Sequence, residues 1–151
     1  MATLLDAYKI FNKKYSISSK FKKSQLIKFI KRIKEKDFLI NNKLNFSPWK
    51  YYKIKKFNFY FLSINKSKII GTLVIINTRY SCHLSFLYID RDYRKKKLGK
   101  KLINFLFLIT KKKMLTVHVF KKHKEVQNFY LNNGFSKAKK SSFKKYNKLA
   151  I

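Results

Sequence analysis

Residues 93–135 read YRKKKLGKKLINFLFLITKKKMLTVHVFKKHKEVQNFYLNNGF, and this stretch holds two of the three glycines in the chain. Gly99 precedes an apolar run, and Gly134 stands between Asn133 and Phe135. Glycine adopts positive φ at little steric cost and lets another group approach the backbone closely. In a chain so poor in glycine, we expect each of the two to meet a backbone requirement and both to belong to one site.

The rest of the chain predicts alternating strands and helices around this stretch. Apolar residues at helical spacing predict helices, and runs rich in aromatic and β-branched residues predict strands. In chain order the sequence predicts a helix over 24–36, strands over 57–64 and 68–77 joined by a turn at 65–67, a strand over 83–89, a helix that begins near Gly99, a strand over 115–120, a helix over 125–132 and one or two edge strands after it. The first 20 residues are ambiguous.

This order predicts a mixed α/β fold in a single domain over 1–151. The central sheet is expected to be antiparallel in its N-terminal half, where a turn joins consecutive strands, and βαβ in its C-terminal half. Gly71 lies inside the second predicted strand. We expect it to be a small residue beneath a neighbour rather than a bulge.

The charge of the chain is extreme, because 38 Lys+Arg against 6 Asp+Glu give a net charge of +32. Abundant lysine, asparagine, isoleucine, phenylalanine and tyrosine indicate an AT-rich coding sequence, which explains the preference for lysine over arginine. It does not explain the scarcity of acidic residues. A field this positive attracts polyanions such as RNA, ribosomes or anionic cofactors. Codon composition and selected affinity for polyanions both remain as explanations.

The composition predicts a cytoplasmic protein. A single cysteine, Cys82, excludes a disulfide within the chain, so nothing indicates an oxidising compartment. No apolar run approaches the roughly 18 residues of a membrane span, and the N-terminus lacks the apolar region of a secretory signal. The chain is long enough to bury a core without disulfides or metal, and we expect no metal site.

The segment that follows the strand over 83–89 has the features of an anion site. Arg94, Lys95, Lys96, Lys97 and Lys100 surround the start of the next helix. The first amides of a helix have no partner within it, and the helix dipole makes that end positive. Cations there oppose the dipole, and a bound phosphate would remove the conflict. The alternative is the solvated basic start of an ordinary helix.

The run LYIDRDYRKKKLGKKLINFL resembles the phosphate loop of the GNAT superfamily of acyl-CoA-dependent N-acyltransferases. That loop follows the pattern Gln/Arg-x-x-Gly-x-Gly/Ala, which is matched here by Arg94, by Leu98 in the variable place and by Gly99. Lys97 stands where the first glycine is usual. A side chain there needs room beside the pyrophosphate, although the amides of Lys95–Lys100 remain as donors.

A second run, EVQNFYLNNGF, resembles the short GNAT helix that ends in Tyr-x-x-x-Gly-Phe, through Tyr130, Gly134 and Phe135. The resemblance covers about 58–135, with the element order of the family throughout. It implies that coenzyme A lies between two splayed parallel strands, over 85–89 and 115–120. The cofactor-binding residues that it implies are Leu87, Tyr88 and Ile89 for the pantetheine, Arg94, Lys95, Lys96, Lys97, Leu98, Gly99 and Lys100 for the phosphates, and His123, which takes the place of an asparagine that often begins the short helix.

The resemblance further implies direct transfer of an acetyl group from acetyl-CoA to an amine. Such a transfer needs a neutral amine, stabilisation of the oxyanion and a proton for the leaving thiolate. The resemblance assigns the thiolate proton to Tyr130, for which the alternative is core packing with Phe129 and Phe135. A backbone N–H around Tyr88 would serve the oxyanion.

The general base is not evident, because the strand over 83–89 lacks the glutamate that the family often carries there. His83 is the candidate base, acting through water, with His118 as a second candidate; the alternative for each is a structural role. The pKa of a lysine amine, near 10.4, lies about three units above pH 7.5, so removing its proton costs roughly 4 kcal/mol. The pKa of an α-amine, near 8, lies close to that pH, so removing its proton costs almost nothing. The missing carboxylate therefore favours an α-amine or another weakly basic amine as acceptor.

The segment Phe46–Lys53 interleaves aromatic residues with lysines. Such a segment either covers the core with its charges solvated or stacks bases and binds phosphates. The second possibility admits a toxin-like acetyltransferase that acts on aminoacyl-tRNA. A rival of another class is an RNA-binding or ribosome-associated protein that keeps the GNAT fold without catalysis.

Overall fold

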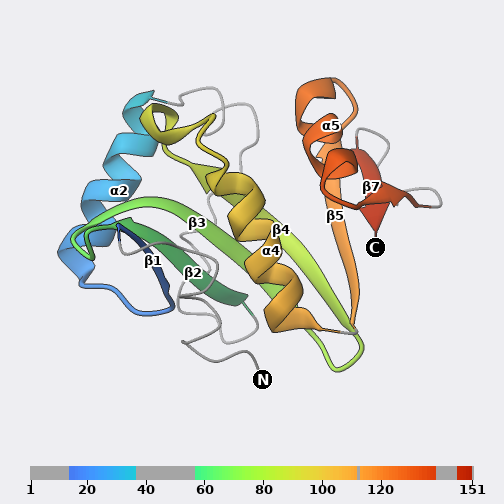
Figure 1. Cartoon of the computed structure of the whole chain (residues 1–151), viewed down its shortest axis with the longest axis horizontal. Coiled ribbons are helices and arrows are strands. Elements are labelled where there is room, and N and C mark those ends of the chain that lie inside the picture. The colour runs from blue at the N-terminus through green and yellow to red at the C-terminus, as the bar shows by residue number, and fades with distance from the viewer. Residues whose placement is uncertain (1–13, 37–56, 112, 139–145, 151) are drawn as a thin grey trace.

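The computed structural model describes residues 14–36, 57–111, 113–138 and 146–150. These residues form a seven-stranded mixed sheet in the order β1-β2-β3-β4-β5-β7-β6 (Figure 1). In chain order the elements are β1 Tyr15–Ser18, α2 Lys23–Lys36, β2 Phe57–Ile64, β3 Lys68–Asn77, β4 Ser81–Ile89, the 3-10 turn η2 Arg91–Tyr93, α4 Leu98–Thr110, β5 Met114–Phe120, α5 Lys124–Asn132, β6 Ser136–Lys137 and β7 Tyr146–Ala150. None of the described helices is long and apolar enough to cross a membrane.

The predicted order of elements is confirmed from the helix at 24–36 onward, with boundaries that differ by a residue or two. Two strands follow α5, as expected, but only β6 lies at an edge, because β7 pairs with both β5 and β6. Strand β1 was not predicted. It offers only Tyr15 and Ile17 as buried apolar residues, which is too short an alternation to show in the sequence.

Two apolar clusters line the two faces of the sheet, one beneath α2 and the other beneath α4 with a contribution from α5. Side chains alternate between the faces along a strand, so Val74 joins one cluster while its neighbours Leu73 and Ile75 join the other. The cluster under α2 contains Leu26, Phe29, Ile33, Phe59, Phe61, Ile69, Val74 and Tyr88. The larger cluster under α4 includes Leu73, Ile75, Leu84, Leu102, Ile103, Leu106, Val117, Val119, Tyr130 and Phe135.

Strand β3 contains a bulge next to Gly71. Leu62 of β2 pairs with Gly71 and Ser63 with Ile69, which leaves Ile70 as the extra residue. A Cβ added to Gly71 would lie 2.9 Å from the carbonyl oxygen of Tyr88 and 3.0 Å from Cδ1 of Ile89. Gly71 is therefore the expected small residue beneath a neighbour, since β4 leaves no room for a side chain.

The sheet splits between β4 and β5. Val74 pairs with Phe86 and Ile75 with Leu84, so Ser85 is an extra residue in β4. The parallel pairing of β4 with β5 covers only Ser81–Leu84 and stops at this bulge. Beyond it β4 pairs with β3 and β5 with β7, and the two strands diverge toward the start of α4 (Figure 1). The predicted splayed parallel strands are confirmed.

Candidate cofactor and acyl-transfer site

The open end of the split leads to the turn that begins α4. Asp90 follows β4 and caps η2, with its carbonyl oxygen accepting from the Tyr93 amide at 2.9 Å. Lys97 is the N-cap of α4, and within the described chain its side chain makes no capping hydrogen bond. The first turn of α4 contains no acidic residue. The Lys97 side chain does not cap the described amides at this helix start, and exposed lysines flank it, which is the arrangement of an anion site.

The turn keeps its backbone conformation without glycine. Lys95 and Lys97 both have φ of 60°, in the left-handed region. This conformation costs a residue with a Cβ about 1–2 kcal/mol. Lys97 occupies the position where the resembling loop has its first glycine, so the conformation that glycine adopts freely is retained here under strain.

Gly99 lies within the first turn of α4, where its lack of a side chain makes room for a ring. A Cβ at this position would lie 3.2 Å from Cε2 and Cζ of Phe129 on α5. The expected close approach is therefore made by an aromatic side chain of the protein itself, and φ at Gly99 is not in the positive range. Gly99 lets α5 come against the start of α4.

Gly134 ends α5 through its conformation. Its φ is 97°, and its amide donates to the carbonyl oxygen of Leu131 at 3.3 Å, while the Phe135 amide donates to that of Tyr130 at 3.1 Å. These two bonds form a Schellman motif, in which an apolar contact joins the residue after the glycine to the last turn. Here that contact is Phe135 on Tyr130, with ring centroids 5.3 Å apart. The Tyr-x-x-x-Gly-Phe motif is thus a helix ending that fixes Tyr130.

Tyr130 is buried between two aromatic rings. Its side chain is 6% exposed, and the Phe129 ring lies 5.2 Å from its ring in an edge-on arrangement. Burial raises the pKa of the Tyr130 hydroxyl, which keeps the proton on its oxygen at every working pH. The packing of Tyr130 with Phe129 and Phe135 is confirmed, and its role as proton donor stays a prediction.

His83 lies on β4 just before the split, beside His118 of β5. The His83 Nδ1 atom is 2.9 Å from the Thr116 hydroxyl, and the two imidazole rings are 5.0 Å apart. Burial, His118 and Lys148 together lower the pKa of His83 to about 4. Burial and Lys148 also lower the pKa of His118. Both imidazoles are therefore neutral at pH 7, and His83 is a weak base.

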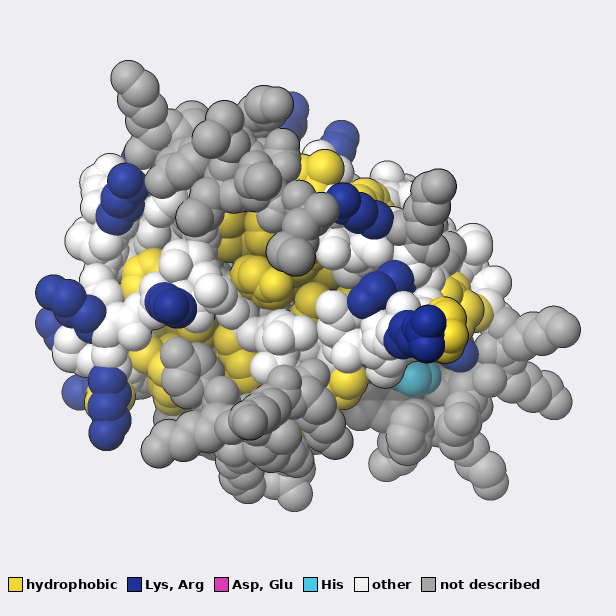
Figure 2. Space-filling view, turned by 90° about the horizontal axis from the view of Figure 1, so that it is seen from below, with side chains coloured by type: hydrophobic (Ala, Val, Ile, Leu, Met, Phe, Trp, Pro, Cys, Tyr) yellow, Lys and Arg dark blue, Asp and Glu magenta, His cyan; other side chains and the backbone are white. Residues whose placement is uncertain are grey.

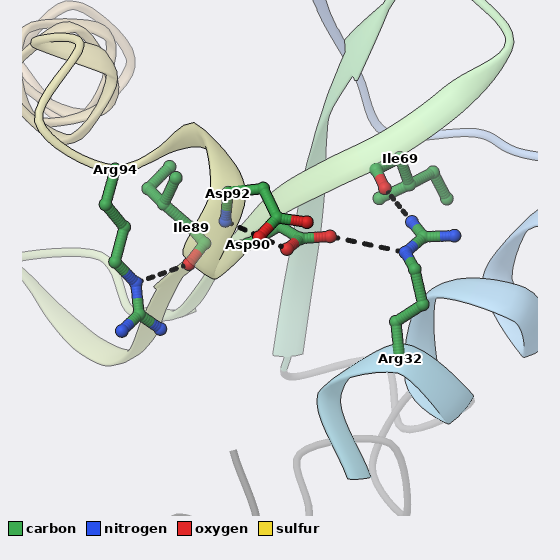
Figure 3. A network of polar contacts seen from close by, with 6 residues as sticks. All are labelled: Arg32, Ile69, Ile89, Asp90, Asp92 and Arg94. Atoms are coloured by element: carbon green, nitrogen blue, oxygen red, sulfur yellow. Dashed lines mark hydrogen bonds and ion pairs between the residues drawn. The ribbon is translucent and has the colours of Figure 1, made fainter. Parts of the chain in front are cut away.

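The wall of the split on β4 is formed by Leu87, Tyr88 and Ile89, whose backbone pairs with β3 on its other side. Arg94 folds back onto this wall, since its Nε donates to the carbonyl oxygen of Ile89 at 2.9 Å (Figure 3). The Arg94 guanidinium lies 5.3 Å from the centre of the Tyr88 ring. The first residue of the phosphate-loop motif is thus attached to the strand that precedes it.

Comparison with known proteins identifies the family. Residues 55–137, more than half of the chain, match the family model of the acetyltransferase (GNAT) domain. The chain belongs to the GNAT superfamily. No curated protein sequence matches this GNAT chain significantly.

Solved structures share the GNAT fold along almost the whole chain. An acetyltransferase from Streptococcus agalactiae is 19% identical, with a TM-score of 0.66, and the match covers 91% of this chain and 97% of that one. An acetyltransferase from Thermus thermophilus is 14% identical, with a TM-score of 0.71 over 91% and 96% of the two chains. A spermidine N-acetyltransferase from Vibrio cholerae, in complex with CoA and spermine, is 14% identical, with a TM-score of 0.68 over 93% and 96%. At these identities the likeness shows the fold, and the family assignment supports an acyltransferase.

Of the predicted site residues, Leu87, Tyr88 and Ile89 line the split, and residues 94–100 form the turn and the start of α4 that follow β4. Tyr130 belongs to the apolar cluster under α4, whereas His83 points to the opposite face, because its neighbours Cys82 and Leu84 belong to that same cluster. The two candidate catalytic side chains therefore lie on opposite faces of the sheet. The segment Phe46–Lys53 lies outside the described residues.

His123 is an exposed residue at the start of α5, where its ring lies 5.4 Å from that of Phe120. It makes no side-chain cap to the described helix. Sequence reasoning missed Gln127, whose buried amide nitrogen donates to the carbonyl oxygens of Phe120 at 3.0 Å and Lys121 at 2.9 Å. A buried glutamine on an otherwise apolar helix face was the available signal. Through Gln127, α5 holds the end of β5, which is the second wall of the split.

Proposed function

We propose that this protein is an N-acetyltransferase that transfers the acetyl group of acetyl-CoA directly to an amine. The observation that carries the proposal is the split between β4 and β5, which opens onto the uncapped, lysine-rich start of α4. Backbone groups of Leu87, Tyr88 and Ile89 would hold the pantetheine, and the turn amides from Lys95 to Lys100 would hold the phosphates. Acetyl-CoA supplies the activated acyl group as a thioester.

We assign separate catalytic roles to the two candidate side chains, which lie on opposite faces of the sheet. Burial raises the pKa of the Tyr130 hydroxyl, so the hydroxyl is protonated at pH 7 and would donate a hydrogen bond, and then its proton, to the leaving thiolate. His83 is neutral at pH 7 and would accept the amine proton through water. A backbone N–H around Tyr88 would stabilise the oxyanion. Asp90, the carboxylate nearest to the end of β4, is engaged in an ion pair with Arg32, which leaves the imidazoles as the candidate bases.

A base with a pKa of about 4 removes protons poorly from strongly basic amines. An α-amine has a pKa near 8 and a lysine amine has a pKa near 10.4, so the α-amine loses its proton at much lower cost near pH 7. We therefore propose an α-amine or another weakly basic amine as acceptor. Matched peptides with either the α-amine or one lysine ε-amine blocked test this. Faster acetylation of the ε-amine would exclude the proposed acceptor class.

Calorimetric titration with acetyl-CoA at low salt tests the proposed cofactor. We expect binding with a micromolar dissociation constant, and an absence of binding would remove the proposal. Release of free thiol in the presence of an amine then tests transfer.

Replacing Tyr130 by phenylalanine keeps the ring packing, so we expect unchanged acetyl-CoA binding and a kcat lower by about 10²-fold. An unchanged kcat would assign Tyr130 to the core alone.

The positive surface supports the second candidate, an RNA- or ribosome-binding protein with this fold. Figure 2 shows lysine and arginine side chains spread over one face, with no acidic side chain among its described residues. Binding of a polyanion through such a surface weakens steeply as salt increases. Salt-dependent RNA binding without affinity for acetyl-CoA would favour this candidate. A toxin-like acetyltransferase of aminoacyl-tRNA would show both activities, and growth arrest that Tyr130→Phe abolishes.

A further inference from the structure

A partly buried ion pair joins α2 to the turn that begins the phosphate loop. Arg32 Nε lies 3.3 Å from Oδ2 of Asp90, whose side chain is 2% exposed, and Arg32 Nη2 donates to the carbonyl oxygen of Ile69 (Figure 3). The forked guanidinium reaches both acceptors at once, which a lysine ammonium on its single stem does less well. Arg32 thus connects the Asp90 carboxylate to α2 and, through Ile69, to β3.

Asp90 connects this ion pair to the backbone of the turn. Its amide donates to the carbonyl oxygen of Ile70 at 2.6 Å, and its Oδ1 accepts from the Asp92 amide at 3.4 Å. This bond to Ile70 extends the pairing of β3 with β4 by one residue beyond the Gly71–Ile89 pair. Neighbouring carbonyl groups of β3 therefore accept from Arg32 and from the Asp90 amide.

A second set of contacts runs from the same helix to Arg94. Phe29 of α2 packs edge-on against Tyr88, with ring centroids 5.9 Å apart, and the Arg94 guanidinium lies over the Tyr88 ring. Arg94 also donates to Ile89, as described above. Helix α2 therefore supports the loop both at Asp90, where its turn begins, and at Arg94, where its motif begins.

The loop needs such support because its conformation is unfavourable by itself. Lys95 and Lys97 are both in the left-handed region, and a strained backbone persists only where the surroundings hold it. Lys96 lies 5.3 Å from the centre of the Tyr93 ring, and Lys68 approaches the same ring at 5.4 Å. Like charges in one short turn also repel one another.

We propose that Arg32 is a positioning residue for the phosphate loop: from α2 it holds the Asp90 carboxylate that caps the turn into the loop, and so sets the loop amides for a pyrophosphate. This inference rests on the proposed function, since it assigns the loop to coenzyme A. Arg32 acts through Asp90 and does not touch the ligand.

The test compares two acyl donors in the wild-type protein and in Arg32→Ala. We expect Arg32→Ala to raise the dissociation constant of coenzyme A and the KM for acetyl-CoA by about tenfold, with kcat nearly unchanged. Acetylpantetheine lacks the pyrophosphate, so its kcat/KM should not change. An equal loss with both donors, or a coenzyme A dissociation constant within twofold of the wild type, would overturn the proposal.

Further variants separate positioning from folding. Arg32→Lys keeps the charge and should lie between Arg32→Ala and the wild type, and it replaces Arg32→Ala as the test if thermal unfolding shows that the latter does not fold. Asp90→Asn should weaken coenzyme A binding as well, and the double variant with Arg32→Ala should bind no more weakly than Asp90→Asn alone. Additive losses of coenzyme A affinity in the double variant would show that Arg32 does not act through Asp90.

The matched control is Lys28→Ala, because Lys28 is an exposed cation on the same helix. It should leave the affinity for coenzyme A within twofold of the wild type, and a tenfold loss would show that net charge rather than positioning is responsible. If the wild-type protein itself does not bind coenzyme A, the proposed function fails together with this inference. If the wild type binds and Arg32→Ala binds equally well, only the inference fails.

Discussion

At the scale of single residues, Gly99 is constrained by Phe129, whose ring occupies the space that a side chain would need. We expect Gly99→Ala to destabilise the protein by about 1 kcal/mol, since the cost of overpacking exceeds the gain in helix propensity. Urea unfolding measures this change. Phe129→Leu in the same chain should recover most of the loss, because leucine does not reach the added methyl group. A more stable single variant would show that the ring moves away freely.

His83 gives the protein a pH-dependent stability with a defined sign. Its pKa is lowered from 6.5 to about 4 in the folded chain, so the unfolded chain binds more protons between these values. The free energy of unfolding therefore falls as the pH drops from about 6.5 to 4. For this partly exposed group we expect about 1 kcal/mol after allowance for solvent screening.

The pH effect is measured as the difference between the wild type and His83→Asn, because other groups titrate in the same range. The groups that face His83 are Thr116 and His118 on β5 and Lys148 on β7. Lys148→Ala should raise the pKa of His83, which NMR titration follows directly. A pH slope that is identical in the wild type and His83→Asn would contradict the assignment.

Sequence reasoning reached the residues whose function depends on local pattern and missed those that depend on distant contacts. Gly134 was predictable because a glycine after a short helix is a local signal of its end. The partnership of Arg32 with Asp90 was not, since 58 positions separate them and no periodicity connects a helix residue to a turn. The requirement for glycine at position 99 was also missed, because it comes from the Phe129 ring, which lies on another helix.

At the scale of elements, the turn before α4 stores strain at Lys97, whose φ is 60°. We expect Lys97→Gly to stabilise the protein by about 0.5–1 kcal/mol, because the gain from removing the Cβ exceeds the added freedom of the unfolded chain. Thermal unfolding measures this gain. Lys96→Gly is the control, since no positive φ is recorded at position 96, and it should be destabilising. Equal effects of the two substitutions would contradict the strain argument.

The elements themselves were largely predictable, and their pairing less so. Helical spacing of apolar residues identified α2, and runs rich in aromatic and β-branched residues identified β2 and β3. The two-residue β6 and the inserted β7 depend on pairing between distant segments, which a pattern along the chain does not encode. The split itself was expected only from the resemblance, since a bulge at Ser85 leaves no mark in the composition of β4.

At the scale of the whole molecule, β7 pairs with the outer side of β5, which is the second wall of the split. Residues 118–120 of β5 pair with β7 and no longer with β4. Leu149 is fully buried in the cluster under α4. We expect Leu149→Ala to lower the free energy of unfolding by about 3 kcal/mol and to weaken acetyl-CoA binding as well. Unchanged binding at a temperature where the variant is folded would show that β5 needs no support from β7.

Lys148→Ala is the control for Leu149→Ala, because it changes the neighbouring side chain of the same strand without emptying the core. It should leave the free energy of unfolding within about 0.5 kcal/mol of the wild type at pH 7. A loss as large as that of Leu149→Ala would indicate that the strand rather than the buried leucine is sensitive.

The position of β7 also bears on how the protein is made. During synthesis β7 leaves the ribosome after every other described element, yet it is inserted between β5 and β6. A nascent chain that ends at Lys137 already contains both candidate signatures, but the outer edge of β5 still lacks its partner. Exposed strand edges recruit other chains, so the interval before β7 emerges is when this protein is most exposed to aggregation and to chaperones.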